Sequence, residues 1–460
     1  MRHLLVLCLM AAVLLPSAFA VAQVPGQTPQ FEEYEIPETE TPDARHTLWE
    51  YLDVGVLVLF MLAAGWLVLV VRKRIWIAVL MVGALLWFGF IRLGCVCSIG
   101  AVQNVSAGLC DPGYYVPLAI VAFFAIPVLF SLIHGRTFCA AVCPLGAIQD
   151  LFVIKPIRVP RWLEGGLSMM AWVYLGLAVI LAGVGGGFLI CRYDPFVSFF
   201  RLLPVGQWLH MAGVTGAVSG QQGFTGRVDM LLLALGIVFL LVGVFIARPY
   251  CRFLCPLGAI FRVTSRFSAW HAKITPDECV QCRLCEHSCP FNAIDPPTGG
   301  KKDKGLVRDK KAVAGLLVIS PLVIAVAAAL GWLAGEPVSQ LHPRVRLADQ
   351  VWSENLGLVD KPVEDDDVQT PSEAWRAQGE DKKVLYEDAV SLTSTISFAT
   401  ALLGGLLGLM IVGKLIGTYI RRYREGYEPN RSLCLACGRC FEHCPVEKKR
   451  RNKIGGVLKS

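Results

Sequence analysis

Two stretches decide the fold: Cys279-Val-Gln-Cys282-Arg-Leu-Cys285-Glu-His-Ser-Cys289-Pro290 and Cys434-Leu-Ala-Cys437-Gly-Arg-Cys440-Phe-Glu-His-Cys444-Pro445. Both follow the spacing C-x2-C-x2-C-x3-C-P. A tight loop with this spacing brings three thiolates onto one face of a cubane, and the fourth cysteine, held off by proline, reaches a neighbouring cluster. Structural zinc sites also use cysteine pairs. Four closely spaced cysteines that end in Cys-Pro, present twice, favour [4Fe–4S] clusters over zinc.

The two runs lie about 150 residues apart, with two apolar segments between them. If both runs face the same side of a membrane, the second can complete a domain that the first begins. We therefore expect a crosswise assignment, in which each run lends its last cysteine to the other cluster. One cluster would use Cys279, Cys282, Cys285 and Cys444, and the other Cys434, Cys437, Cys440 and Cys289. Two separate, uncrossed sites are the alternative.

The rest of the chain has the composition of an integral membrane protein. Of its 460 residues, 55% are hydrophobic and 17% are charged, which excludes an ordinary soluble domain and a disordered chain. Seven apolar runs are each near the length of a membrane-crossing helix. They span residues 53–71, 75–93, 115–133, 167–190, 229–247, 312–334 and 394–420. We predict an all-α membrane bundle of about seven transmembrane helices with a small ferredoxin-like α+β iron–sulfur domain.

The N-terminal end predicts export. Residues 1–20 combine a basic start, an apolar stretch and the small-residue site Ala18-Phe19-Ala20, which is typical of a signal peptide. An uncleaved membrane anchor is the alternative. Residues 21–48 would form a short acidic exported segment. With that segment outside, the inner loops hold 30 of the 43 lysines and arginines and the outer segments 11. This agrees with the positive-inside rule and explains the basic loops without nucleic-acid binding.

This topology places the chain in the bacterial cytoplasmic membrane as a multi-pass protein. The ferredoxin motifs and the C-terminus would then be cytoplasmic. The expected segments are a membrane core (49–262), a first ferredoxin half (263–311), a helix (312–334), a periplasmic loop (335–393), a helix (394–420) and a second ferredoxin half (421–460).

A third set of cysteines comes from an internal repeat. Arg136-Thr-Phe-Cys139-Ala-Ala-Val-Cys143-Pro-Leu-Gly-Ala-Ile148 recurs as Arg248-Pro-Tyr-Cys251-Arg-Phe-Leu-Cys255-Pro-Leu-Gly-Ala-Ile260, at the inner ends of the third and fifth runs. A C-x3-C pair on a helix places both thiols on one face. Cys139, Cys143, Cys251 and Cys255 would then supply one [4Fe–4S] cluster at the membrane boundary. Cysteines that merely pack in an apolar interior are the alternative.

The last four cysteines fall on the outer side: Cys95, Cys97, Cys110 and Cys191. Cys97-Ser-Ile-Gly-Ala-Val-Gln103 is a degenerate copy of Cys143-Pro-Leu-Gly-Ala-Ile-Gln149. A fourth [4Fe–4S] cluster is one interpretation. Disulfides are the other, because exported cysteines pair in an oxidising compartment.

Two C-x3-C-P motifs at membrane helix ends, followed by two ferredoxin runs, resemble the NapH/NosR-like membrane polyferredoxins. The resemblance covers roughly residues 75–300 and 430–446 and rests on the third set and the eight ferredoxin cysteines. It implies electron transfer between the quinone pool or cytoplasmic donors and periplasmic reductases or their maturation. One branch also has an exported flavin domain. This chain has a short acidic segment in that place, so a separate periplasmic flavoprotein or cytochrome would fill the role.

We therefore expect an electron-transfer subunit of a membrane oxidoreductase complex, without a substrate site of its own. Thiolate clusters move single electrons and no protons. Up to four [4Fe–4S] clusters would carry electrons between cytoplasmic or quinone-side donors and a periplasmic-side partner. A quinol dehydrogenase with its own quinone site, and a maturation or metal-reductase factor for a respiratory enzyme, are the alternatives.

Overall fold

The computed structural model describes residues 47–92, 98–154, 156–202, 227–275, 278–298, 309–357, 371–420 and 423–457. The expected signal peptide, nearly all of the acidic segment that follows it, Cys95 and Cys97 lie outside these residues. Within the described residues the chain is mostly helical, and its two strands are β1 (Ile294–Asp295) and β2 (Glu428–Pro429).

Each of the seven predicted apolar runs overlaps an apolar helix. These helices are α2 (Thr47–Trp66) continued by the π-helix η1 (Leu67–Val71), α3 (Arg74–Ala84) continued by η2 (Leu85–Ile91), α5 (Leu118–His134), α8 (Arg161–Gly183), α12 (Arg227–Phe245), α16 (Lys310–Leu333) and α20 (Lys382–Tyr419). Among the described residues, five apolar helical stretches are long enough to cross a bilayer, whereas Leu118–His134 and Leu231–Phe245 are shorter. The chain thus has several apolar helices suited to a membrane.

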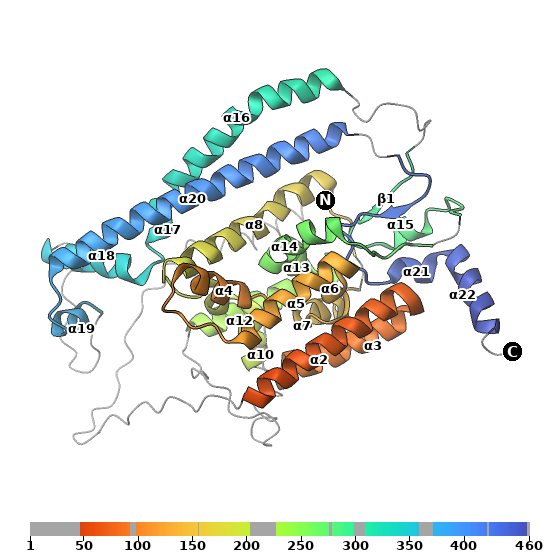
Figure 1. The fold of residues 1–460 in the computed structure, drawn as a ribbon, viewed down its shortest axis with the longest axis horizontal. Helices are drawn as coiled ribbons and strands as arrows, with labels where there is room; N and C mark the ends of the chain where they lie inside the picture. The colour runs from red at the N-terminus through yellow and green to blue at the C-terminus, as the bar shows by residue number, and fades with distance from the viewer. Residues whose placement is uncertain are drawn as a thin grey trace.

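Helices α16 and α20 form a long pair that lies along α8 on one side of the bundle (Figure 1). Glycines let their backbones touch. A Cβ atom on Gly404 would stand 2.2 Å from the carbonyl oxygen of Ala327, and one on Gly331 would stand 2.2 Å from that of Thr400. Small residues at such contacts are the usual basis of helix pairing in membranes, where burial from water adds little.

The duplicated motif folds the same way twice. After α5 the chain forms the short helices α6 (Thr137–Ala141) and α7 (Pro144–Leu151), and after α12 it forms α13 (Pro249–Phe253) and α14 (Pro256–Thr264). In both copies a proline begins the second helix, where its missing N–H costs nothing. The turn is closed alike: the N–H of Cys143 donates to Phe138 O and that of Cys255 to Tyr250 O, each at 2.9 Å.

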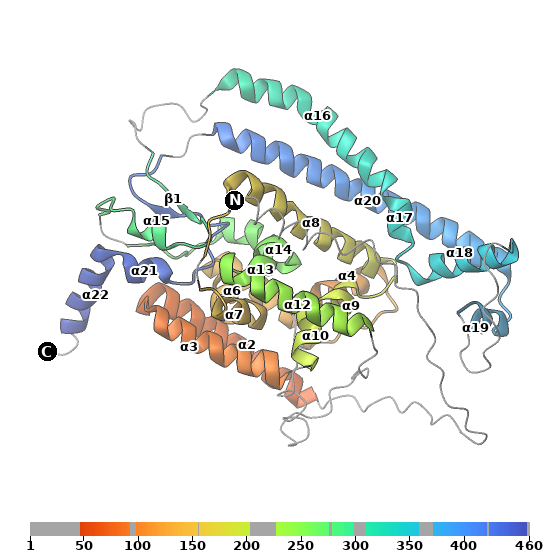
Figure 2. The ribbon, with the colours of Figure 1, turned by 180° about the vertical axis from the view of Figure 1, so that it is seen from behind.

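At one end of the long helices lie β1, β2, α15 (Leu284–Ser288), α21 (Arg439–His443) and α22 (Pro445–Val457) (Figures 1 and 2). The strands pair antiparallel, with Ile294 opposite Pro429 and Asp295 opposite Glu428. This ladder joins the two halves that α16 and α20 separate in sequence. Arg72, in the α2–α3 turn, fastens the assembly to the bundle: it forms an ion pair with Glu447 at 2.7 Å and lies over the Phe441 ring.

The opposite end carries α17 (Gly335–Ser339), α18 (Pro343–Asn355) and α19 (Pro371–Ala377). We expected residues 335–393 to be a loop and the last helix to start at 394. Helix α20 instead begins at Lys382, where Asp381 caps the Lys383 N–H. Its first turns gain burial from a small core of their own, made of Ala348, Val351, Trp375, Leu385 and Ala389.

Candidate iron–sulfur centres

The cysteines of the two ferredoxin runs line two separate cavities. Each cavity mixes the runs: three cysteines come from one and the last cysteine from the other. The first is lined by Cys279, Cys282, Cys285 and Cys444, with Ile274 and Tyr427. The second is lined by Cys434, Cys437, Cys440 and Cys289, with Phe291 and Phe441. These are the two groups that the crosswise assignment predicts, and four thiols around a closed, largely apolar space fit a cubane cluster.

The backbone shows why three thiols of one run meet. In the first run Gln281 and Arg283 have φ values of 53° and 62°, and in the second Ala436 and Gly438 have 55° and 75°. These are equivalent positions on either side of the second cysteine. Two left-handed residues coil the loop around one centre and turn its N–H groups inward. The Ala436 N–H accordingly points at the Cys434 sulfur, 3.4 Å away.

Burial disfavours the thiolate form of Cys285 and Cys434, one thiol in each cavity. It raises the pKa of Cys285 to about 11 and that of Cys434 to about 12. Iron binds the thiolate form, so cluster assembly must release these protons. Among the described residues, no three Cys, His, Asp or Glu side chains converge on a point that would hold a single metal ion.

The third set is also brought together. Cys139, Cys143, Cys251 and Cys255 are all buried, with exposed fractions of 7–9%, and lie where α6–α7 meets α13–α14. Two sulfurs accept hydrogen bonds of 3.3 Å: Gln149 Nε2 donates to Cys251, and the Gly258 N–H donates to Cys255. Hydrogen bonds of this kind stabilise thiolate and tune the potential of a bound cluster.

The arginine that opens each copy of the repeat reaches across to the other copy. Arg248, fully buried, donates to the carbonyl oxygens of Cys139 and Ala140. Arg136 lies beside Gly258, where an added Cβ atom would stand 3.5 Å from its Nη2. These reciprocal arginine contacts hold the two copies of the repeat together around their four cysteines.

The same arginines bridge the third set and the second cavity. Arg136 donates to Ser432 O at 3.2 Å, two residues before Cys434. The Arg248 charge acts on Cys437 of the second cavity as well as on Cys251 and Cys139. Arg252 completes the link by donating to Phe291 O at 3.2 Å. The second cavity therefore faces the membrane core, while the first lies beyond it.

Asp150, near the end of α7, connects the repeat to the second ferredoxin run. Its carboxylate pairs with Arg74 at 3.1 Å and with Arg248 and Arg439 at 3.3 Å each. Burial alone would raise the pKa of Asp150, but the guanidinium groups of Arg248, Arg439 and Arg74 outweigh it and hold this pKa at about 2. Arg439 sits between two cysteines of the second run, so Asp150 connects that run to the repeat.

Of the outer cysteines, Cys110 ends α4 (Ala101–Cys110) and Cys191 lies in α9 (Leu189–Tyr193); both are exposed. A pair of glutamines relates this region to the third set. Gln149 Oε1 accepts the N–H of Tyr250, the residue before Cys251, at 3.2 Å. Gln103 Oε1 accepts the N–H of Ile190, the residue before Cys191, at 2.9 Å. The degenerate copy thus keeps the same buried contact.

Sequence reasoning missed the polar residues around the cysteines. Arg136, Arg248, Gln149 and Gln103 all stand inside the quoted repeats, at matching offsets from a cysteine. Their recurrence was a usable signal. Asp150 gave none, because its three partners come from segments 76 to 289 residues away in sequence.

Comparison with known proteins defines the class. Models described as "4Fe-4S binding domain" match residues 116–158 with 228–275, and residues 272–295. The first match covers the two copies of the repeat and the second covers the first ferredoxin run. The chain is a membrane iron–sulfur protein with [4Fe–4S] binding domains.

Its relatives are membrane polyferredoxin-type proteins. The chain is 25% identical over 307 residues to Protein NirI of Paracoccus denitrificans (62% of this chain, 40% of the relative). It is 26% identical over 180 residues to the putative electron transport protein YccM of Escherichia coli (38% and 45%). It is 29% identical over 181 residues to the ferredoxin-type protein NapH of Escherichia coli (38% and 54%). The chain spans less than two thirds of each. No solved structure matches.

Proposed function

We propose that the chain carries electrons through four [4Fe–4S] clusters, from a donor at its ferredoxin end to a partner at the opposite face of the membrane. Cluster I uses Cys279, Cys282, Cys285 and Cys444, and cluster II uses Cys434, Cys437, Cys440 and Cys289. Cluster III uses Cys139, Cys143, Cys251 and Cys255. Cluster IV uses Cys95, Cys97, Cys110 and Cys191.

The observation that carries this proposal is that three groups of four cysteines follow one another from the ferredoxin end into the membrane core. Cys440 of the second cavity lies within the electrostatic reach of Cys285 of the first. Arg248 then acts on cysteines of both the second cavity and the third set. Buried guanidinium groups between sites II and III stabilise the reduced state of both and hold them in fixed register.

Support for cluster IV comes from Gln103, which repeats the contact that Gln149 makes beside the third set. Tyr250 links the two regions: its hydroxyl donates to Asp194 Oδ2 at 2.7 Å, three residues after Cys191. Both Tyr250 and Asp194 are buried. The Tyr250 side chain thus connects the third set to the segment that carries Cys191.

In a cell, we propose that the chain sits in the bacterial cytoplasmic membrane with its ferredoxin end in the cytoplasm. It would act as the electron-transfer subunit of an oxidoreductase complex, with a periplasmic flavoprotein or cytochrome as acceptor. Similarity to the putative electron transport protein YccM and to the ferredoxin-type protein NapH supports an electron-transfer role of this kind.

The proposal is tested by iron and acid-labile sulfide per polypeptide after anaerobic purification. We expect about sixteen iron in the wild type and about twelve in Cys191→Ser, since each cluster holds four. About twelve in both, with outer disulfides seen by mass, would leave no cluster IV.

The crosswise assignment has its own test in Cys289→Ser. We expect the EPR signal of the cluster bound by Cys434, Cys437 and Cys440 to change, and that of the cluster bound by Cys279 to stay. The matched variant Cys444→Ser should give the reverse pattern. An uncrossed arrangement exchanges the two results.

A further inference from the structure

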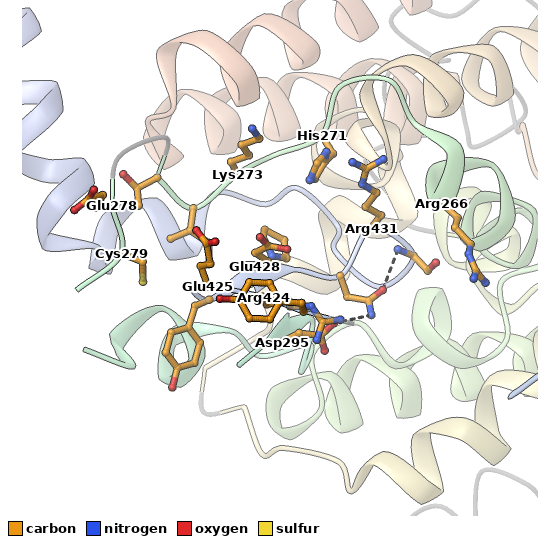
Figure 3. A pocket seen from close by; sticks show the side chains of 18 residues that line it. Arg266, His271, Lys273, Glu278, Cys279, Asp295, Arg424, Glu425, Glu428 and Arg431 are labelled. Atoms are coloured by element: carbon orange, nitrogen blue, oxygen red, sulfur yellow. Dashed lines mark hydrogen bonds and ion pairs between the residues drawn. The ribbon is translucent and has the colours of Figure 1, made fainter. Parts of the chain in front are cut away.

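A large open groove lies at the ferredoxin end, between the segment from Arg266 to Cys279 and the segment from Tyr423 to Ser432 (Figure 3). Its volume of about 1010 Å³ is at the upper end of the range for small-molecule sites, roughly 300–1000 Å³. No cluster assigned above occupies it.

The groove shares a wall with the cavity of cluster I. Ile274, Cys279 and Tyr427 line both. The backbone at Gly426 passes so close that a Cβ atom there would stand 2.7 Å from Cys279 Cβ. A molecule in the groove therefore lies against a ligand of cluster I, with no protein layer between them.

Charge is distributed unevenly along the groove. Figure 3 shows Lys273, His271 and Arg431 along one wall with Arg266 beyond them, while Glu278 and Glu425 lie toward Cys279 and Glu428 lies near the middle. Asp295 is already neutralised, since it pairs with Arg424 at 2.7 Å. One end of the groove is therefore basic.

The basic end has room for an anion. Among the described residues, no carboxylate forms an ion pair with Arg266, His271, Lys273 or Arg431. Arg431 is held in place by a 3.2 Å bond from Nη1 to Ser268 O. Partial burial lowers the pKa of His271, and the charges of Arg431 and Lys273 lower it further. A phosphate group would relieve this crowding of positive charge.

We propose that the groove binds a flavin mononucleotide, with its phosphate at the basic end and its ring against Tyr427 and Cys279, and that the reduced flavin donates electrons to cluster I. This rests on the proposed function. A cluster accepts one electron at a time, so its donor must release electrons singly, as a flavin does and a nicotinamide hydride donor does not. The reduced flavin loses two electrons and two protons. Two oxidised [4Fe–4S] clusters each take one electron, and water takes the protons.

Binding is tested by titrating the anaerobically purified full chain with FMN, followed by flavin fluorescence, and with riboflavin, which lacks the phosphate. We expect FMN to bind at least about tenfold more tightly than riboflavin, the effect of one charge-assisted contact. The double variant Lys273→Glu/Arg431→Glu should lose this preference. Lys449→Glu, an exposed change on α22 at the same end, is the matched control.

Iron content checks that the variants fold, and Arg431→Gln is a milder second variant that should lose about tenfold in FMN affinity. Equal affinity for the two flavins, or a double variant that binds FMN as well as Lys449→Glu does, overturns the proposal.

Electron entry is tested separately by stopped-flow. Reduced FMN should bleach the cluster absorbance at a rate that saturates with concentration, and the double variant should lose saturation. Dithionite should still reduce every cluster in both proteins. Clusters that dithionite cannot reduce would contradict the proposed function, whereas loss of FMN binding with intact dithionite reduction would contradict the groove assignment alone.

Discussion

Asp150→Asn is the substitution that most directly tests the junction between the ferredoxin end and the repeat. The side chain keeps its volume but loses the charge that three guanidinium groups share. A pKa lowered from 3.8 to about 2 corresponds to a stabilisation of about 2.5 kcal/mol, at about 1.4 kcal/mol for each pKa unit. Leaving buried arginines without their anion costs about 3–5 kcal/mol. We expect Asp150→Asn to lower the free energy of unfolding by about 2.5–5 kcal/mol.

The pH dependence follows from the same pKa. An acid whose pKa is lowered by folding stabilises the protein at pH values above its unfolded pKa, and this stabilisation disappears as pH falls toward the folded value. Both values lie below 4 for Asp150. The difference between wild type and Asp150→Asn should therefore be constant between pH 6 and 8, where the clusters can be studied.

The assay is thermal loss of cluster absorbance in detergent, with freeze-quench EPR of electron transfer from cluster II to cluster III. Asp150→Asn should lower the midpoint temperature and slow this step. Glu354→Gln is the matched control, because Glu354 is an acid with a 3% exposed side chain that pairs with Arg376 at the opposite end. It should leave the step unchanged. Equal midpoints and rates for Asp150→Asn and wild type would refute the role given to this carboxylate.

Three further substitutions probe other contacts. Arg72→Gln removes a buried ion pair with Glu447 and should lower the stability of the protein by about 3–5 kcal/mol. The loss should appear as faster proteolysis of α22, and the exposed substitution Lys448→Gln should leave the proteolysis rate unchanged. Gly404→Leu should push α16 from α20 and cost about 1–3 kcal/mol by overpacking, whereas Gly413→Leu, with nothing within 4 Å of its Cβ position, should be tolerated in the same thermal assay. Gln149→Leu removes a hydrogen bond to the Cys251 sulfur and should make the potential of cluster III more negative; an unchanged EPR redox titration would count against that contact.

The apolar helices and the three clustered cysteines of each ferredoxin run were accessible from sequence because both depend on local spacing. Apolar length predicted α16, and topology predicted that Cys444 would join Cys279 in one cavity. What sequence could not predict depends on tertiary contacts. The start of α20 at Lys382 depends on packing against Trp375, and the pairing of β1 with β2 joins residues about 134 apart. Strands of two residues have no periodicity from which to infer them.

The repeat suggests how the membrane core would hold the proposed cluster III. A membrane interior penalises unpaired charge, and a reduced cluster with four thiolates is an anion. Arg248 and Arg136 place positive charge beside the third set. Arg248, from the second copy, contacts the Cys139 carbonyl of the first copy, and Arg136, from the first copy, lies beside Gly258 of the second. One copy alone would not bind a cluster, because it carries only two cysteines. The arginine that lies beside those cysteines comes from the other copy. Duplication would therefore provide both the ligands and the compensating charge, and Asp150 pairs with Arg248 of the repeat and with Arg439 of the second ferredoxin run.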